Sequence, residues 1–384
     1  MRSIGVVSVA RSDYGIYLPL LRRIKNDPDL NLLLIVTGMH LSPEFGMTAN
    51  RIEDDGFKIH RKIEMLVSSD TAIGTGKSIG LGTIGFAELY GEGQIDLLVV
   101  LGDRFEMLTA VVASLPFDIP IAHIHGGEST EGLIDEAIRH SISKMSHLHF
   151  VSNDRYGQRV VQMGEAPWRV IVSGSPTIDN LTTTKLRAKP EIYDRLGIDI
   201  SSPYLLVTFH PITLKPEDTA SDLASLLEAL EVVDLNVVFT YPNADPGYDR
   251  IIKFINEEFK NRRKYKIFKN AGSSMYANLI ANSKALVGNS SSGIVEAASF
   301  KKPAVNIGTR QDGKFMPKNV INTGYNSINI LNGIKIALSK RFNKKIKNLL
   351  NPYESNISIK KIVSLILNLK KNDKLLRKKF IDKK

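Results

Sequence analysis

The chain has 384 residues, of which 43% are hydrophobic and 24% are charged. That composition is typical of soluble globular proteins, and the length favours two domains over one. The absence of cysteine excludes disulfides, cysteine-ligated zinc and thiolate catalysis, and no apolar run is long enough to span a bilayer. We expect a cytoplasmic enzyme.

The formal net charge is +11, and lysines concentrate in residues 335–384. A basic end of this kind can bind nucleic acid or an anionic membrane. Apolar residues recur there at helical spacing, however, and aromatic residues are few. We therefore interpret this end as solvated helix faces followed by a basic tail, and we expect neither nucleic acid nor a membrane as a partner.

Short apolar runs alternate with helical patterns along the chain. In the first half, strands are predicted at residues 4–9, 32–36, 97–101, 120–124, 148–151 and 170–172, with helices at 16–24, 105–113, 135–145 and 154–163. A polar segment, 175–196, is interpreted as an interdomain linker. The second series has strands at 204–209, 237–240, 267–269, 285–287 and 304–307, with helices at 217–233 and 294–299. This alternation predicts an α/β fold of two halves with largely parallel sheets and a ligand cleft between them.

Two glycine-rich motifs suggest nucleotide binding at first sight. Residues 74–78 lack the first glycine of a phosphate loop. Residues 80–85 match the dinucleotide fingerprint, and Asp103 lies 18 residues beyond its last glycine. Neither motif directly follows a predicted strand, so we interpret residues 78–90 as a helix whose glycines allow close packing or lie near a ligand. This context argues against a nicotinamide cofactor.

Residues that carry chemistry follow the predicted strands of the first half. After the first strand, Arg11 and Asp13 stand at a helix start, where backbone N–H groups favour an anion and an acidic side chain caps well. After the third strand, Asp103 is either a general acid or base or a helix cap. These positions coincide with the edge at which α/β sheets bind ligands.

The richest stretch follows the fourth strand. His125 and Glu128 flank a double glycine, and Asp135 opens the next helix. Burying so many histidines and carboxylates together is costly without a purpose. The stretch therefore predicts proton-handling groups at the end of a strand.

The second half offers a different set of residues. His210 ends its first strand and is a candidate acid or base, although a lone histidine is more often structural. Three serines at 290–292 follow a later strand and open a helix, where hydroxyl and backbone N–H groups form a phosphate cradle. Glu296, one turn later, is placed to accept hydrogen bonds from ribose hydroxyls. The plain alternative is a serine-capped helix with an acid in its first turn.

Taken together and in order, these stretches resemble the hydrolysing UDP-N-acetylglucosamine 2-epimerases of bacterial sialic-acid and related nonulosonic-acid biosynthesis. Several long motifs in one order are more specific than any one of them. The resemblance runs from residue 4 to about residue 313 and rests on residues 11–15, 37–40, 101–104, 123–128, 135–136, 209–211, 242–245, 288–293 and 306–311.

The resemblance implies the glycosyltransferase-B architecture, in which two Rossmann-like domains face a cleft. We expect an N-terminal domain at 1–180 with most acid/base residues and a nucleotide-binding domain at 181–365. Residues 366–384 would form the basic tail, with the final helices packing on the first domain. The family uses neither NAD nor a metal, and its members are commonly homodimers or homotetramers.

The reaction implied by the resemblance begins when a base removes the proton at C2 of the sugar. UDP then leaves from C1 and a 2-acetamidoglucal forms. Water adds to C1 while C2 is reprotonated on the other face, which gives N-acetylmannosamine and UDP. Proton transfer on both faces of one carbon needs several groups with different pKa values.

The resemblance also assigns residues. Asp103, Glu128 and Asp135 are the catalytic carboxylate candidates, and His210 assists the leaving diphosphate. Many relatives carry glutamate where this chain has His125, so either His125 or Glu128 takes that acid/base role. The residues expected to bind the substrate or its nucleotide are Arg11, Asp13, Asn243, Tyr276, Ser290, Ser291, Ser292, Gly293, Glu296 and Arg310.

Other functions stay open at this point. The first alternative is the same reaction on a UDP- or GDP-linked diacetamido sugar of a legionaminic-type pathway. A retaining glycosyltransferase would share the phosphate cradle but needs no cluster of acids around C2. A nonhydrolysing epimerase would return the nucleotide sugar intact. The intact acid set argues against a regulatory binding protein with an inactive site.

Overall fold

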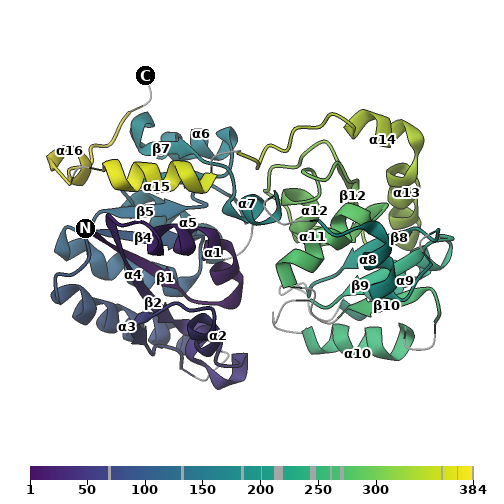
Figure 1. Cartoon of the computed structure of the whole chain (residues 1–384), viewed down its shortest axis with the longest axis horizontal. Coiled ribbons are helices and arrows are strands. Elements are labelled where there is room, and N and C mark those ends of the chain that lie inside the picture. Colours follow the sequence, from purple (N-terminus) through teal and green to yellow (C-terminus); the bar gives the residue numbers. More distant parts are fainter. Residues whose placement is uncertain are drawn as a thin grey trace. The chain divides into compact units, whose positions relative to one another are not determined.

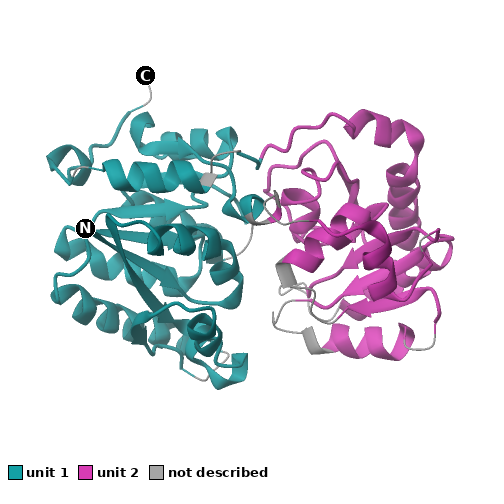
Figure 2. Ribbon diagram, viewed as in Figure 1, with its two compact units in different colours: residues 1–179, 353–384 teal, residues 180–352 magenta. Residues whose placement is uncertain are grey.

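The computed structural model describes residues 1–67, 71–130, 134–182, 186–199, 201–211, 219–242, 248–259, 262–268, 272–355, 358–369 and 371–382. The chain divides into two compact units (Figure 2). Unit 1 comprises residues 1–179 and 353–384, and unit 2 comprises residues 180–352. Each unit is a parallel sheet with helices, which confirms the predicted α/β fold of two Rossmann-like halves.

Unit 1 contains a seven-stranded parallel sheet in the order β3-β2-β1-β4-β5-β6-β7. Strand β4, with five consecutive apolar residues, is buried along its whole length, as expected for a parallel strand covered on both faces. Most strands lie where the sequence predicted them. Their bounds are β1 Arg2–Ser8, β2 Leu30–Thr37, β3 Ile59–Ile63, β4 Leu97–Leu101, β5 Ile121–Ile124, β6 Leu148–Val151 and β7 Val170–Val172.

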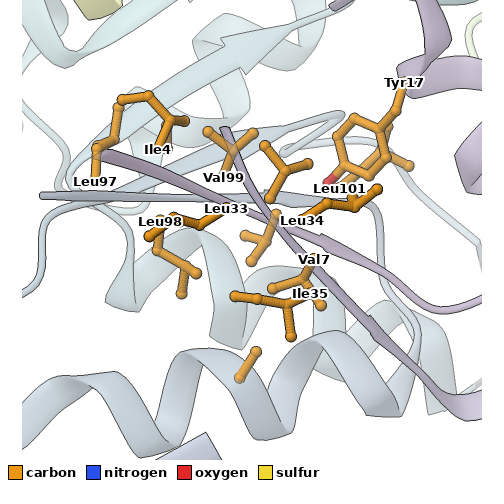
Figure 3. Packing of buried hydrophobic residues seen from close by; sticks show 14 of the residues in the cluster. Ile4, Val7, Tyr17, Leu33, Leu34, Ile35, Leu97, Leu98, Val99 and Leu101 are labelled. Atoms are coloured by element: carbon orange, nitrogen blue, oxygen red, sulfur yellow. The ribbon is translucent and has the colours of Figure 1, made fainter. Parts of the chain in front are cut away.

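The core of unit 1 lies between this sheet and its helices (Figure 3). Ile4, Leu34 and Val99 are each fully buried and come from the three neighbouring strands β1, β2 and β4. Its helices are α1 Arg11–Lys25, α2 Ala49–Asp54, α3 Ala72–Gly91, α4 Phe105–Ser114, α5 Ile134–Met145, α6 Asp154–Gln162, α15 Ser358–Asn368 and α16 Asp373–Leu376, and a 3₁₀ turn, η3, spans Leu115–Phe117. Helix α7, Pro176–Thr182, contains the boundary between the two units.

The basic end of the chain is part of the fold of unit 1. Ile362 and Ile366 of α15 are buried in the same core as β1 and β2. Arg169 donates hydrogen bonds to the carbonyls of Leu375 (2.8 Å) and Lys374 (2.7 Å). The Lys378 ammonium lies 2.8 Å from the carboxylate of buried Glu165. The lysines of this end therefore include groups that hold the fold.

Unit 2 repeats the arrangement with a six-stranded parallel sheet in the order β10-β9-β8-β11-β12-β13. Its strands are β8 Tyr204–Thr208, β9 Asn236–Thr240, β10 Tyr265–Phe268, β11 Ala285–Gly288, β12 Ala304–Ile307 and β13 Val320–Thr323. Its helices are α8 Lys189–Leu196, α9 Thr219–Glu231, α10 Tyr248–Phe259, α11 Gly272–Asn282, α12 Ser292–Val295, α13 Ser327–Leu338 and α14 Lys340–Ile346.

The structure adds elements that the sequence pattern did not predict. The polar segment 175–196 was expected to be a linker, but it contains α7 and α8. Helix α8 begins with Pro190 in its first turn and ends at Gly197, whose φ of 61° is left-handed. Strands β3 and β13 are also new, and both lie at sheet edges with largely half-exposed side chains.

Both glycine-rich motifs lie inside helix α3. The prediction of a helix at 78–90 is confirmed for the motif at 80–85, and the helix begins six residues earlier than predicted, so it also includes the motif at 74–78. A Cβ atom at Gly82 would lie 2.7 Å from Met65 Cε and 2.9 Å from Thr109 Oγ1, and one at Gly85 would lie 2.7 Å from Ile63 Cγ2. These glycines therefore allow close packing, and the strand–turn–helix frame of a dinucleotide site is absent at this motif. Among the described helices, none combines the length and the apolar character that a membrane crossing requires.

Candidate active site

Each sheet has one point at which the strand order reverses direction. In unit 1 the reversal lies between β1 and β4, and in unit 2 it lies between β8 and β11. Ligands of open α/β sheets bind beyond the carboxyl ends of the strands at such points. Most of the site residues expected from the sequence follow these strands or their neighbours. Each unit therefore has one candidate site at the carboxyl ends of its strands, and these two places are called the first edge (unit 1) and the second edge (unit 2).

At the first edge, Asp13 holds the turn between β1 and α1. Its carboxylate accepts hydrogen bonds from the backbone N–H groups of Val9 (2.8 Å) and Ala10 (2.6 Å) and from Ser8 Oγ (3.0 Å). Burial raises its pKa to about 6, against the lowering effect of these hydrogen bonds. Arg11 is exposed on the same turn. Asp13 thus shapes the turn that presents Arg11, and direct contact of either residue with a nucleotide stays a prediction.

A histidine outside the predicted set supports the same turn. The Ser8 hydroxyl donates a hydrogen bond to Asp13. Ser8 Oγ therefore accepts a hydrogen bond from His40 Nε2 at 2.9 Å. His40 Nδ1 then accepts from Thr48 Oγ1 at 2.7 Å. Burial lowers the pKa of His40 to about 4, which keeps the ring neutral and suits this arrangement.

The acidic residues after β4 and at the start of α5 lie beside arginines. Arg139 forms an ion pair with Asp103 and lies 3.5 Å from Glu136. Burial raises the pKa of Asp135, although the charge of Arg104 acts in the opposite direction. The two carboxyl groups thus differ in surroundings: Asp103 is ion-paired, whereas Asp135 is desolvated.

His123 fixes the position of the backbone next to Asp103. Its Nε2 donates to the carbonyl of Gly102 at 2.8 Å, so its Nδ1 accepts from Ser143 Oγ at 3.1 Å. The ring is fully buried, and burial lowers its pKa to about 3. His123 therefore acts as a neutral support for the β4–α4 turn.

His125 and Glu128 lie together at the ends of three strands. His125 Nδ1 is 3.6 Å from Glu128 Oε1, and its Nε2 is 3.2 Å from the hydroxyl of Ser175 after β7. Ser152, after β6, donates to Glu128 Oε1 at 2.6 Å. His125 has a left-handed φ of 65°, which is uncommon for a residue other than glycine and tends to occur at functional sites.

At the second edge, Asn289 joins the ends of β8 and β11. Its side chain accepts from the backbone N–H of His210 (2.7 Å) and donates to the carbonyl of His210 (2.9 Å). The carbonyl of Asn289 accepts from Gln311 Nε2 (2.9 Å) and Arg310 Nη1 (3.3 Å). Burial, and secondarily the charge of Arg310, lowers the pKa of His210 to about 3. His210 therefore has a neutral imidazole near the charge of Arg310, on a backbone that Asn289 holds in place.

The predicted phosphate cradle is a turn of interacting hydroxyl groups. Ser292 Oγ donates to Ser290 Oγ at 3.0 Å and contacts the Tyr276 hydroxyl at 2.6 Å. Ser291 precedes α12, which spans Ser292–Val295 and is shorter than the predicted helix at 294–299. Gly293 faces Ala304, because a Cβ atom there would lie 3.2 Å from that methyl group. A small pocket opens beside this turn and is lined by Thr208, Tyr276, Ser290, Ser292 and Asn306, among others.

Glu296 lies one turn beyond the serines. Its Oε2 is buried and has no hydrogen-bond partner in the part of the chain that the structure describes. Burial raises its pKa to about 7. An unsatisfied buried carboxyl oxygen is suited to a donor from a ligand. Asn243, the remaining predicted binding residue, lies outside the described residues.

Several residues of these edges were not predicted, and most of them are partners of the ones that were. Arg139 could have been suspected from its i, i+3 spacing to Glu136, which places both on one face of α5. Asn289 stood within the serine motif, but no role was assigned to it. Ser152 and Ser175 gave no signal. Among the described residues, no group of three or more histidine or acidic side chains is arranged to hold a metal ion.

A family profile described as UDP-N-acetylglucosamine 2-epimerase matches residues 22–367. The chain belongs to this family. Its sequence is 39% identical over 384 residues to a GDP/UDP-N,N'-diacetylbacillosamine 2-epimerase (hydrolyzing) of Campylobacter jejuni, which covers 99% of each chain. It is 34% identical to a UDP-N,N'-diacetylbacillosamine 2-epimerase (hydrolyzing) of Legionella pneumophila, over 88% of this chain and 90% of the relative.

Further relatives carry a different substrate in their names. A UDP-N-acetylglucosamine 2-epimerase of Neisseria meningitidis is 32% identical over 100% of this chain and 99% of the relative. A solved structure of a UDP-GlcNAc 2-epimerase from the same species, bound to UDP-GlcNAc, superposes with a TM-score of 0.80 at 18% identity and covers 96% of this chain and 100% of that one. At that identity the superposition establishes the shared fold. The resemblance seen in the sequence is thus confirmed.

Proposed function

We propose that the chain is a hydrolysing 2-epimerase of a UDP-linked sugar and that its preferred substrate is UDP-N,N'-diacetylbacillosamine. The observation that supports the sugar is the 39% identity, over 99% of both chains, to the Campylobacter jejuni enzyme, which is named for diacetylbacillosamine linked to GDP or UDP. The Legionella pneumophila relative carries the same sugar in its name. UDP-N-acetylglucosamine, the substrate expected from the sequence, is the second candidate because the Neisseria meningitidis relative is named for it.

Unit 2 would bind the nucleotide in this proposal. The hydroxyl groups of Ser290 and Ser292 and the start of α12 provide donors for a diphosphate, and Arg310 supplies the positive charge. The unsatisfied oxygen of Glu296 would accept a hydrogen bond from a ribose hydroxyl. Binding of the nucleotide would then give the buried Glu296 oxygen the hydrogen bond that the described residues do not supply.

His210 would assist the departure of the diphosphate as a neutral hydrogen-bond donor. Its lowered pKa keeps the ring uncharged at neutral pH, so it adds one directed N–H group and no full charge. Asn289 holds both backbone groups of His210, which fixes the backbone from which the ring extends. The charge developing on the leaving oxygen would be offset mainly by Arg310.

Unit 1 would transfer the protons. Asp135, whose pKa is raised by burial, retains its proton better than an exposed carboxyl group and is the proposed proton donor. Asp103, oriented by Arg139, and Glu128, oriented by Ser152, are the proposed acceptors, one for the C2 proton and one for the attacking water. His125 is tied to Glu128 and Ser175 and would position Glu128.

The substrate is tested with a panel of UDP- and GDP-linked 2-acetamido and diacetamido sugars, each analysed for free nucleotide and free sugar. We expect release of UDP together with a free 2-epimerised sugar, with the highest kcat/KM for the diacetamido substrate. A higher kcat/KM for UDP-N-acetylglucosamine would select the second candidate. Return of an intact epimerised nucleotide sugar, or nucleotide release only when an acceptor is added, would contradict the hydrolysing reaction.

A further inference from the structure

Five hydroxyl groups follow one another across the second edge. Thr240 and Thr208 are the last residues of β9 and β8, and Thr208 Oγ1 lies 3.4 Å from the Tyr276 hydroxyl. The Tyr276 hydroxyl lies 2.6 Å from Ser292 Oγ, which lies 3.0 Å from Ser290 Oγ. Helices α11 and α12, which carry Tyr276 and Ser292, are neighbours in unit 2 (Figure 1). These five groups are called the hydroxyl chain.

The geometry gives the hydroxyl chain one direction. Ser292 Oγ donates to Ser290 Oγ, and a hydroxyl group has only one proton, so the Tyr276 hydroxyl is the donor to Ser292. With the Tyr276 proton used, Thr208 is the donor in its contact with Tyr276. Thr240 is then the donor in the short contact between the two threonines (2.5 Å). Every proton of the chain therefore points towards Ser290.

This direction matters for Ser290, the last member of the chain. Ser290 accepts a hydrogen bond from Ser292, so it can donate its own proton to a ligand. Each donor in such a series polarises the next, by perhaps 10–30% per bond, and the effect is greatest where water is excluded. Thr208, Tyr276 and Ser292 all lie in buried surroundings. Burial raises the pKa of Tyr276 to about 12, so its hydroxyl keeps the proton that it donates.

We propose that Tyr276 is a positioning residue that acts through Ser292, and that the hydroxyl chain holds the Ser290 proton ready for an oxygen of the substrate's diphosphate. This inference rests on the proposed nucleotide site of unit 2. Ser290 is then the hydroxyl that contacts the diphosphate, and Ser292 supports it. Because the proton of Ser290 is oriented before the ligand arrives, less ordering is needed when the ligand binds.

The test compares the binding of UDP, measured by calorimetry, with that of uridine, measured by ligand-observed NMR, on the full-length chain. Tyr276→Phe removes the hydroxyl group and keeps the ring. It should weaken UDP binding by roughly two- to tenfold, as expected for the loss of one hydrogen bond. Uridine binding should stay unchanged, because uridine has no phosphate.

The matched control is Tyr204→Phe. The buried Tyr204 hydroxyl donates to the carbonyl of Leu279 in α11 at 2.8 Å, and Tyr204 is the first residue of β8, whereas Thr208 is the last. Its loss should leave UDP binding unchanged. Circular dichroism verifies that each variant is folded.

A second site in the chain separates transmission from local packing. Thr208→Val interrupts the hydroxyl chain one step behind Tyr276 and should weaken UDP binding less than Tyr276→Phe does. Thr208→Ser keeps the hydroxyl group and should bind UDP as the wild type does. The double variant with Tyr276→Phe and Thr208→Val should bind UDP as Tyr276→Phe alone does, because Thr208 acts only through Tyr276. If Tyr276→Phe does not fold, the comparison of Thr208→Val with Thr208→Ser decides.

The outcomes distinguish this inference from the proposed function. UDP binding by the wild type that Tyr276→Phe leaves unchanged would overturn the role of Tyr276 alone. Equal losses for UDP and uridine, or losses that multiply in the double variant, would show independent packing effects and overturn it as well. A wild-type chain that binds no UDP would overturn the nucleotide site and the role of the hydroxyl chain together.

Discussion

Asn289 offers the sharpest test of how the second site is held together. Asn289→Ala removes the only side chain that bridges both backbone groups of His210 in the described structure. The N–H and the carbonyl of His210 would then lack these partners in a buried setting, and each such loss costs about 1–3 kcal/mol. We therefore expect the free energy of unfolding of unit 2 to fall by roughly 2–6 kcal/mol.

The assay is urea unfolding followed by circular dichroism, with kcat measured under native conditions. Asn282→Ala is the matched control, because that amide makes a single hydrogen bond to the Asn278 carbonyl within its own helix. It should cost about 1 kcal/mol or less. Asn289→Ala should also lower kcat more than Asn282→Ala, since the backbone that carries the His210 ring would lose its support. Equal stabilities for the two variants would refute the inference that Asn289 holds the site.

Three further predictions concern proton transfer, pH and the basic end. Asp103→Asn and Glu128→Gln should each lower kcat by roughly 10²–10⁴-fold if each residue acts in proton transfer. Near-normal turnover in either variant would exclude the substituted residue from the mechanism. His40, His123, His147 and His210 have pKa values lowered by burial to between about 3 and 4, so they stay neutral while the unfolded chain takes up protons below about pH 6.5. Asp13 and Glu296, with raised pKa values, act in the opposite direction. The histidines with lowered pKa values outnumber these two carboxyl groups, so the free energy of unfolding should fall as the pH is lowered from about 6 to about 5. Urea midpoints that do not change over this range would contradict this. Lys378→Ala should lower the free energy of unfolding by about 1–3 kcal/mol because it removes a partner of the buried Glu165 carboxylate. The control is Lys379→Ala, which changes an exposed lysine and should alter the urea midpoint little. Equal effects of the two substitutions would refute a structural role for Lys378.

The fold was largely predictable because parallel strands buried on both faces appear as continuous apolar runs. Strand β4 and the helix that follows it were located within one residue of their observed bounds. Edge strands do not have this property. Strand β3 reads Ile-His-Arg-Lys-Ile and is buried only at its last residue, so its composition resembled a loop.

The sequence allowed single residues at strand ends to be chosen as candidates for the site. Asp103, Glu128 and His210 were chosen as candidates because acids and histidines directly after apolar strands are conspicuous. Their partners were not, because the pairs are formed by tertiary structure. Arg139 is 36 residues from Asp103, and Asn289 is 79 residues from His210. Both separations are far longer than a local sequence pattern, so neither pair could be predicted from spacing.

Asp13 illustrates a different difficulty. The resemblance to the family suggested that Asp13 contacts the nucleotide, and this contact stays a prediction. The structure shows in addition that the Asp13 carboxylate is hydrogen-bonded to Ser8, Val9 and Ala10. Sequence similarity locates such a residue at the site, but only the hydrogen-bond geometry shows how its oxygen atoms are engaged.

The central claim is that the reaction proceeds by removal and replacement of the proton at C2. The most direct measurement is to run the reaction in deuterium oxide and analyse the free sugar by NMR and mass spectrometry. Elimination followed by hydration predicts one deuterium at C2 in the released, epimerised sugar. A product that carries no deuterium at C2 would contradict the mechanism, whichever sugar is the substrate.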